Sequence, residues 1–126
     1  MRKSTQMMQV SKEISLKKIN DNNLAQLKTK LSFNKYHRYL TVVAANQGIA
    51  TDQLSKFIKG NNHHNASQYL NEIMIPLGWV IAKFHTGNPS KDWLWYLMPV
   101  KQALTLGIHK KLREKIYRLL EAANDE

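Results

Sequence analysis

One stretch of the chain, residues 61–78, combines amide and imidazole side chains on one face of a predicted helix. Its apolar residues recur at the spacing of a single helical face: Ala66, Leu70, Ile73 and Leu77. At about 100° per residue, the opposite face carries His64, Gln68 and Asn71. A solvent-facing helix usually prefers charged residues there. Because an amide pairs a donor with an acceptor, it matches the edge of adenine in the major groove. The face is a candidate base-reading surface, or a polar face that is simply rich in Asn.

Five histidines raise the question of metal chemistry. His63 and His64 are adjacent and therefore diverge on a helix, and His37, His85 and His109 lie far apart in the sequence. No Cys and no cluster of carboxylates completes a ligand set, so we expect no metal site. The glycines form no phosphate-binding loop, and the nine acids are scattered. We expect no cofactor and no enzymatic activity.

Positive charge is concentrated at the N-terminal end of the chain. The sequence has 19 Lys and Arg against 9 Asp and Glu, a formal charge of +10. Residues 1–40 hold nine of these cations and two acids, a net +7, whereas residues 41–100 carry +1 and residues 101–126 carry +2. Such a flank suits an anionic partner such as nucleic acid, or it only keeps the chain soluble. The candidate phosphate contacts in the flank are Lys12, Lys17, Lys18, Lys35 and Arg38.

The composition also predicts where the chain works. It has no cysteine, which excludes disulfides and thiolate metal sites and fits a reducing compartment. No apolar run approaches the roughly 20 residues of a membrane-spanning helix. The basic residues 1–9 are not followed by the apolar stretch of a secretory signal. We expect a cytoplasmic protein without a membrane partner, associated with the nucleoid if the source is bacterial.

The first half of the chain predicts several short helices. Residues 10–31 have a helical pattern that is interrupted by a cluster of Asn and Asp at residues 20–23. Residues 33–47 form a longer helix, which Gly48 ends. Thr51 is then a suitable N-cap for a short helix before the stretch described above.

The second half predicts a hairpin and a last helix. Pro76 should stop the preceding helix near Met74 or Ile75 and leave Ile75 exposed. Residues 79–84 and 93–98 are rich in β-forming side chains and flank a polar loop with Gly and Pro, as in a β-hairpin. A single amphipathic helix is expected from residue 101 to residue 123.

This order of elements resembles the winged helix-turn-helix DNA-binding domain. The residues that carry the resemblance are Gly48–Leu54, Ser67–Ile73, Leu77–Ile81 and Trp95–Leu97, within a match over residues 33–98. The resemblance implies a mainly α fold with a small β-hairpin. The winged helix-turn-helix core (33–99) would be flanked by a basic tail with a helical extension (1–32) and by a C-terminal helix (100–126).

In that family the third helix enters the major groove, and the hairpin wing touches the DNA backbone or the minor groove. The resemblance implies base contacts from His64, Asn65, Gln68 and Asn71, and wing contacts from Lys83, His85, Asn88 and Lys91. Two features depart from the family pattern. The third helix has no Arg or Lys, although Arg to guanine is the commonest base contact, and Pro76 falls inside the helix end.

Two groups of apolar residues have two interpretations each. Trp79, Trp93 and Trp95 form a stacking surface for single-stranded bases, or they pack the hairpin onto the helices, which we favour. The stripe of the last helix covers the core or forms a dimer seam like that of a short coiled coil. Its members are Leu112, Ile116, Leu119 and Ala123.

Together these features predict a non-enzymatic protein that binds double-stranded DNA in a sequence-specific manner. It would be a small transcriptional regulator, or an accessory factor of a phage, plasmid or compact genome, and the last helix could join two copies into a homodimer. Winged helices also dock other proteins. The alternative is therefore a winged-helix adaptor that binds another protein and has only weak contact with nucleic acid.

Overall fold

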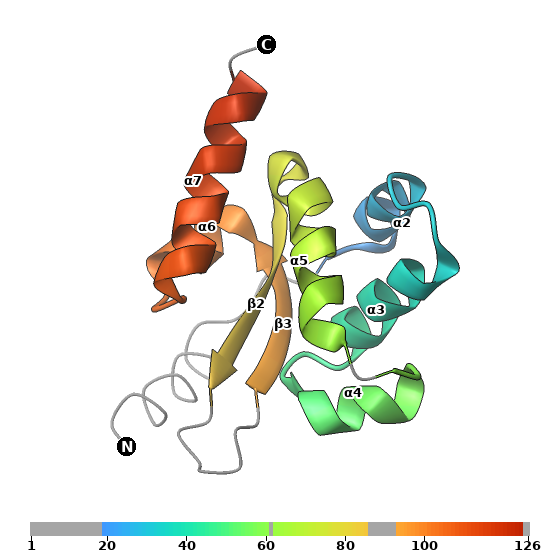
Figure 1. Ribbon diagram of the computed structural model, residues 1–126. Coiled ribbons are helices and arrows are strands. Elements are labelled where there is room, and N and C mark those ends of the chain that lie inside the picture. The colour runs from blue at the N-terminus through green and yellow to red at the C-terminus, as the bar shows by residue number, and fades with distance from the viewer. Residues whose placement is uncertain (1–18, 61, 86–92, 125–126) are drawn as a thin grey trace.

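The protein is mainly helical, with one small antiparallel sheet (Figure 1). The computed structural model describes residues 19–60, 62–85 and 93–124. The elements, in chain order, are α2 (Asp21–Thr29), α3 (Asn34–Ala45), β1 (Ile49–Ala50), α4 (Thr51–Phe57), α5 (His63–Met74), η1 (Ile75–Leu77), β2 (Trp79–His85), β3 (Trp93–Pro99), α6 (Val100–Thr105) and α7 (Lys110–Asn124). The expected mainly α fold with a hairpin is confirmed, and the order from α3 to β3 is compatible with a winged-helix-like fold.

A third strand that the sequence did not predict completes the sheet. The strand order is β1-β3-β2, and both pairings are antiparallel. β1 has only two residues, too few for an alternating pattern to be recognised. Gly48 was expected to end α3, but α3 already stops at Ala45. Gly48 has a φ of 89° and donates its N–H to the carbonyl oxygen of Trp95 at 2.7 Å, which aligns β1 with β3.

The hairpin is apolar on both faces, and each face lies against its own hydrophobic cluster. Helices α2–α5 enclose a first cluster, to which the hairpin contributes Ile81, Trp95 and Leu97. Helices α6 and α7 cover a second cluster, to which the sheet contributes Val80, Ala82, Phe84, Tyr96 and Met98. Successive side chains of a strand point to opposite faces. Figure 1 accordingly shows the sheet between α6 and α7 on one side and α3 and α5 on the other.

Two expectations about helix ends need correction. α5 stops at Met74 as expected, but the chain continues as the 3₁₀ turn η1, in which Ile75 has no exposed surface. The expectation that Ile75 is exposed was wrong because this turn directs its side chain into the second cluster. The last helix is also not continuous. It breaks between α6 and α7, where Leu106 and Ile108 enter the same cluster.

The stripe of the last helix covers the core. Ile116 has no exposed surface, Leu112 and Leu119 pack half-buried against the second cluster, and Ala123 is exposed. Ile116 would have to leave the core to join a dimer seam. Core covering therefore accounts for the stripe, and pairing of two chains stays a prediction.

Trp95 packs inside the protein, in agreement with the favoured interpretation of the tryptophans. It is 1 % exposed, and its ring stacks on Tyr39 with 6.3 Å between centroids. Its indole N–H donates to the Thr51 hydroxyl at 2.8 Å. Thr51 was expected to cap α4, but Ala50 is the N-cap residue and makes no side-chain cap hydrogen bond. Thr51 is the first residue of α4, and its hydroxyl joins α4 to β3. Trp79 is half-buried, and Trp93 is more exposed at the far end of the hairpin.

Truncation of Ile116 tests whether α7 belongs to the folded core. Ile116→Ala should lower the free energy of unfolding by about 2–5 kcal/mol, because it removes a fully buried side chain and leaves a cavity. Tyr117→Ala on the exposed side of the same helix should change it by only about 0.5 kcal/mol. Urea unfolding of the two variants provides the comparison. Equal, small effects would show that α7 is not packed on the sheet.

Candidate nucleic-acid interface

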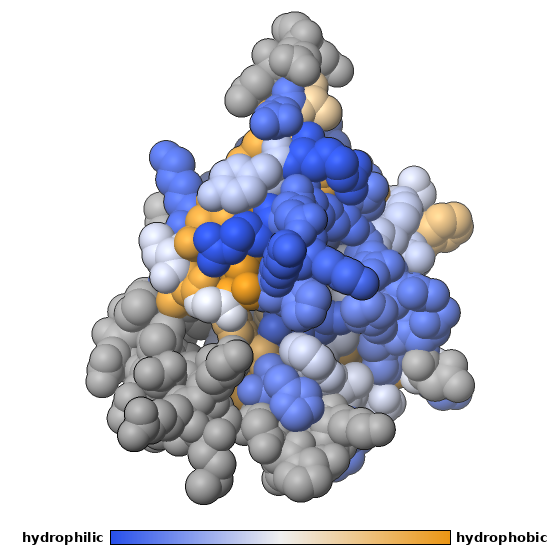
Figure 2. Space-filling view, turned by 60° about the vertical axis from the view of Figure 1, so that its left-hand side comes forward, coloured by the Kyte–Doolittle hydropathy of each residue, from blue (hydrophilic) through white to orange (hydrophobic). Residues whose placement is uncertain are grey.

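One side of α5 faces solvent along its whole length. The exposed side chains are those of His64, Asn65, Gln68, Tyr69 and Glu72, which we call the outer face of α5. They span about 140° of the helix at 100° per residue. Four of the five are polar, and only one carries a full charge at neutral pH. On the side of the molecule that Figure 2 shows, hydrophilic side chains form a broad area beside an apolar one.

Asn71 does not belong to this outer face. It is 4 % exposed, its amide nitrogen donates to the Ile81 carbonyl at 3.0 Å, and its amide oxygen accepts from the Ile81 N–H at 2.8 Å. The expectation that Asn71 faces outward is wrong, because β2 runs along that side of α5. Its amide pairs with both backbone groups of one residue of β2, as a residue of a neighbouring strand would, so this side chain contributes to the fold.

His63 fixes the start of α5 from inside. It is buried, and its two ring nitrogens meet the Tyr39 hydroxyl and the Ser55 hydroxyl, the latter at 2.9 Å. Burial, and then the nearby charge of Lys35, lowers the pKa of His63, so the ring is neutral. Because α3, α4 and α5 meet at this ring, the next residue, His64, is directed outward.

His64, Gln68 and Lys83 form a polar network at the edge of the outer face. The Lys83 ammonium donates to Nδ1 of His64, and the Gln68 amide lies 3.1 Å from Nε2. The Lys83 ammonium and the Gln68 amide nitrogen are both donors, and a neutral imidazole has only one acceptor nitrogen, so the ring accepts one full hydrogen bond from this pair at a time. Burial lowers the pKa of His64, and the charges of Lys83 and Lys115 lower it further. The ring is therefore neutral at neutral pH, and this edge presents an amide and an imidazole side by side.

Lys83 is a partly buried cation, and its loss of hydration disfavours the charged form. Its ammonium nitrogen lies 5.0 Å from the centroid of the Trp95 ring, and burial lowers its pKa to about 8. It lies at the expected place on β2, but beside α5 and not at the tip of the hairpin. Lys83 therefore adds positive charge next to His64.

Helix α7 brings two further cations to α5, neither of which was expected from the sequence to be a site residue. The Lys115 ammonium lies 3.3 Å from Oε2 of Glu72 and donates to the Gln68 carbonyl oxygen at 3.1 Å. The Arg118 guanidinium lies 3.6 Å from the same carboxylate oxygen. The two cations are three residues apart, which puts them on one face of a helix. The sequence alone predicts that Lys115 and Arg118 share a helix face, but it does not predict that this face lies against α5.

The other candidate residues are more dispersed. Lys35 and Arg38 are exposed on α3, where Lys35 is near enough to His63 to influence its pKa. His85 ends β2, and its ring meets the Trp93 ring with 4.9 Å between centroids. The remaining candidates lie outside the described residues: Lys12, Lys17, Lys18, Asn88 and Lys91.

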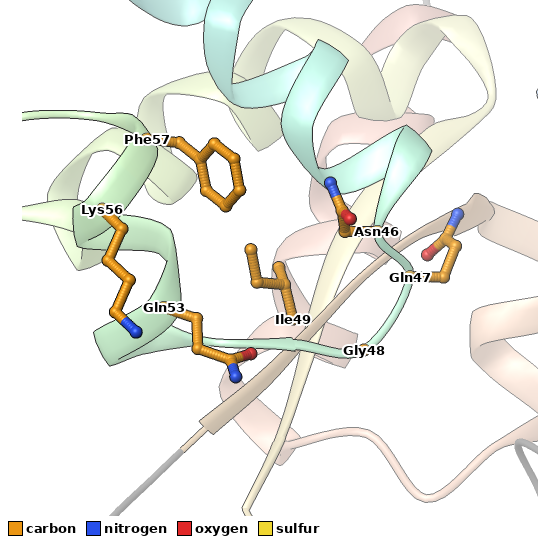
Figure 3. A pocket seen from close by; sticks show the side chains of 7 residues that line it. All are labelled: Asn46, Gln47, Gly48, Ile49, Gln53, Lys56 and Phe57. Atoms are coloured by element: carbon orange, nitrogen blue, oxygen red, sulfur yellow. The ribbon is translucent and has the colours of Figure 1, made fainter.

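A separate hollow lies between the end of α3, β1 and α4 (Figure 3). Its volume is about 490 Å³, and Ile49 and Phe57 point into it. Its lining consists of Asn46, Gln47, Gly48, Ile49, Gln53, Lys56 and Phe57. Lys56 is the one ionisable side chain among these, so the lining offers no acid–base pair. Within the described ranges, no three His, Asp or Glu side chains gather as a metal site would need, and no helix is long and apolar enough to cross a membrane.

Asn71 should matter for stability. Asn71→Ala leaves the N–H and carbonyl of Ile81 without their partners, and each unpaired buried group costs about 1–3 kcal/mol of unfolding free energy. Gln68→Ala, one turn earlier on the exposed side, should cost no more than about 0.5 kcal/mol. Chemical denaturation measures both. An Asn71→Ala protein as stable as the Gln68→Ala protein would contradict the structural role of Asn71.

Lys83 should give stability a distinctive dependence on pH. Its pKa falls from the ordinary 10.5 to about 8 in the folded protein. Between these values the unfolded chain binds a proton that the folded chain does not, so the free energy of unfolding rises with pH. Lys83→Met lacks this titration. The stability of the wild type relative to that variant should therefore increase from about pH 8 to about pH 10 in urea unfolding, and a constant difference would contradict the lowered pKa.

Comparison with known proteins yielded no relative. A scan against protein-family models, a search of curated proteins and a search of solved structures each found no match for the chain. A functional assignment therefore depends on the chemistry of the site itself.

Proposed function

We propose that the chain is a winged-helix protein that binds double-stranded DNA in a sequence-specific manner, as a small transcriptional regulator or accessory factor. The order of elements from α3 to β3, with β1 paired to β3, supports the winged-helix assignment. In the family that the sequence resembles, the third helix of the core lies in the major groove. In this chain that helix is α5.

The observation that carries the proposal is a neutral polar face flanked by cations from other elements. His64, Asn65 and Gln68 offer donors and acceptors to base edges without a net charge of their own. Lys83 of β2 and Lys115 of α7 lie close enough to His64 to lower its pKa. The two tasks of a DNA-binding surface, reading bases and attracting phosphates, are thereby divided between α5 and its neighbours.

The dimensions of the outer face suit a groove. From His64 to Glu72 the helix rises about 12 Å at 1.5 Å per residue, and the major groove is about 12 Å wide. With α5 in the groove, α7 would follow one edge of it, where Lys115 and Arg118 could meet phosphates. Lys35 and Arg38 on α3 would supply backbone contacts from another element.

A second candidate function is supported by aromatic side chains beside α5. The rings of Tyr36 and Tyr69 lie 4.4 Å apart, the ring of Phe33 lies 6.1 Å from that of Tyr36, and Phe33 is 63 % exposed. Exposed aromatic side chains are typical of protein-binding surfaces. An adaptor that docks another protein would use this group, and Phe33→Ala would then weaken partner binding while DNA binding is unchanged.

Replacing Gln68 tests the DNA-binding proposal. A preferred site is first selected from random duplexes with the full chain. Gln68→Ala should then weaken binding to this site by about 1–3 kcal/mol, the usual value of a paired base contact, and leave a scrambled duplex almost unaffected. Gln53→Ala, the same change at an exposed position of α4, is the matched control.

Arg118→Gln should affect DNA binding differently, because Arg118 is the more exposed of the two cations of α7. It should weaken the selected and the scrambled duplex alike and reduce the slope of log affinity against log salt by about 0.9, the value for one phosphate contact. Lys101→Gln on the exposed side of α6 is the control.

Two outcomes would contradict the proposal. If Gln68→Ala left the ratio of the affinities for the selected and the scrambled duplex unchanged, α5 would be excluded as the base-reading element. If the wild type bound no duplex at low salt, the adaptor function would take precedence.

A further inference from the structure

Glu72 is the single acidic residue of α5, and it lies on the outer face of the helix where phosphates would approach. One of its oxygens, Oε2, meets both Lys115 and Arg118 of α7, at 3.3 Å and 3.6 Å. We propose that Glu72 is an internal counter-ion that occupies these two cations in the free protein and lowers its affinity for DNA of any sequence. The inference rests on the proposed DNA-binding function.

The two cations differ in how firmly they are held. The Lys115 side chain is 19 % exposed and has a second partner in the Gln68 carbonyl oxygen, so it stays against α5. The Arg118 side chain is 64 % exposed and has the longer contact with Glu72. An exposed ion pair of this kind is weak and is screened by salt, and a guanidinium fork fits a phosphate well. Arg118 is therefore the side chain that exchanges Glu72 for a DNA phosphate.

This arrangement would limit how tightly the protein is held on DNA that offers no base contacts. A carboxylate at the groove edge repels phosphates wherever the protein lands, and phosphate attraction supplies most of non-specific binding. At the correct site, base contacts from His64, Asn65 and Gln68 offset the loss of the Glu72 pairing. Weakening the attraction that all sequences share leaves the ratio between specific and non-specific affinity unchanged, but it reduces the fraction of protein that is held on DNA of other sequences.

Glu72→Gln tests this role, because it removes the charge and keeps the shape of the side chain. We expect its affinity for a scrambled duplex at low salt to be about 5- to 10-fold higher than that of the wild type, a gain of the size expected for freeing one phosphate contact. Asp21→Asn is the control, since it makes the same change in net charge on α2, away from the outer face. Asp21→Asn should raise the affinity for the scrambled duplex by less than about 2-fold.

A double variant shows whether the gain acts through α7. In an Arg118→Gln background, Glu72→Gln should give less than half of the gain that it gives alone, because the cation that it releases is missing. The counter-ion role is wrong if Glu72→Gln leaves the scrambled affinity unchanged, if Asp21→Asn gives the same gain, or if the gain persists without Arg118. A loss confined to the selected site would instead identify Glu72 as a reader of cytosine. A wild type that binds neither duplex would overturn the proposed function and this inference together.

Discussion

A hairpin that is apolar on both faces cannot leave either face in water, and this constraint organises the molecule. The first face is covered by α2–α5 and the second by α6 and α7. Covering the second face brings Ile75 of η1 and Ile116 of α7 into the same cluster. Because η1 directly follows α5, a helix that packs on η1 must also run beside α5. The basic side of α7 reaches the outer face of α5 as a consequence of how the hydrophobic surface is buried.

The orientation of α5 is fixed by polar contacts as well as by packing. His63 joins the start of the helix to α3 and α4, and Asn71 joins its second half to β2. Among the described residues, no buried side-chain nitrogen or oxygen lacks a hydrogen-bond partner. Such contacts are directional, so they set the rotation of the helix more narrowly than apolar contacts do. The rotation in turn determines that His64 and Gln68 face solvent.

Charge at this surface comes from outside the helix that would meet the bases. Lys83, Lys115 and Arg118 belong to β2 and α7, and Glu72 balances part of their charge. The absence of Arg and Lys from α5, which departs from the pattern of the winged-helix family, is thus compensated locally. Under the proposed function, a face of α5 without cations would also keep general attraction and base discrimination on separate residues, so that each could change without the other.

Much of the fold could be predicted from local pattern. The alternation in residues 79–84, the stop at Pro76 and the apolar face of α5 depend on neighbours in sequence, and the structure confirms the hairpin and the helix end. The two-residue strand β1 and the break before α7 could not be predicted, because each depends on a distant partner: Trp95 for β1 and the second cluster for Leu106 and Ile108.

For the site, the sequence by itself determined which chemical groups α5 carries and that His63 and His64 diverge. Periodicity gives the angle of a side chain around its helix, but it does not say where the neighbouring element begins. Asn71 and Gln68 differ by only about 60° on the helix, yet β2 covers Asn71 and leaves Gln68 in solvent. The pairing of Glu72 with Lys115 and Arg118 joins residues more than forty positions apart. Only the packing of α7 on the sheet could bring them together, because the sequence specifies that α7 must be buried on one side and not which surface it then adjoins.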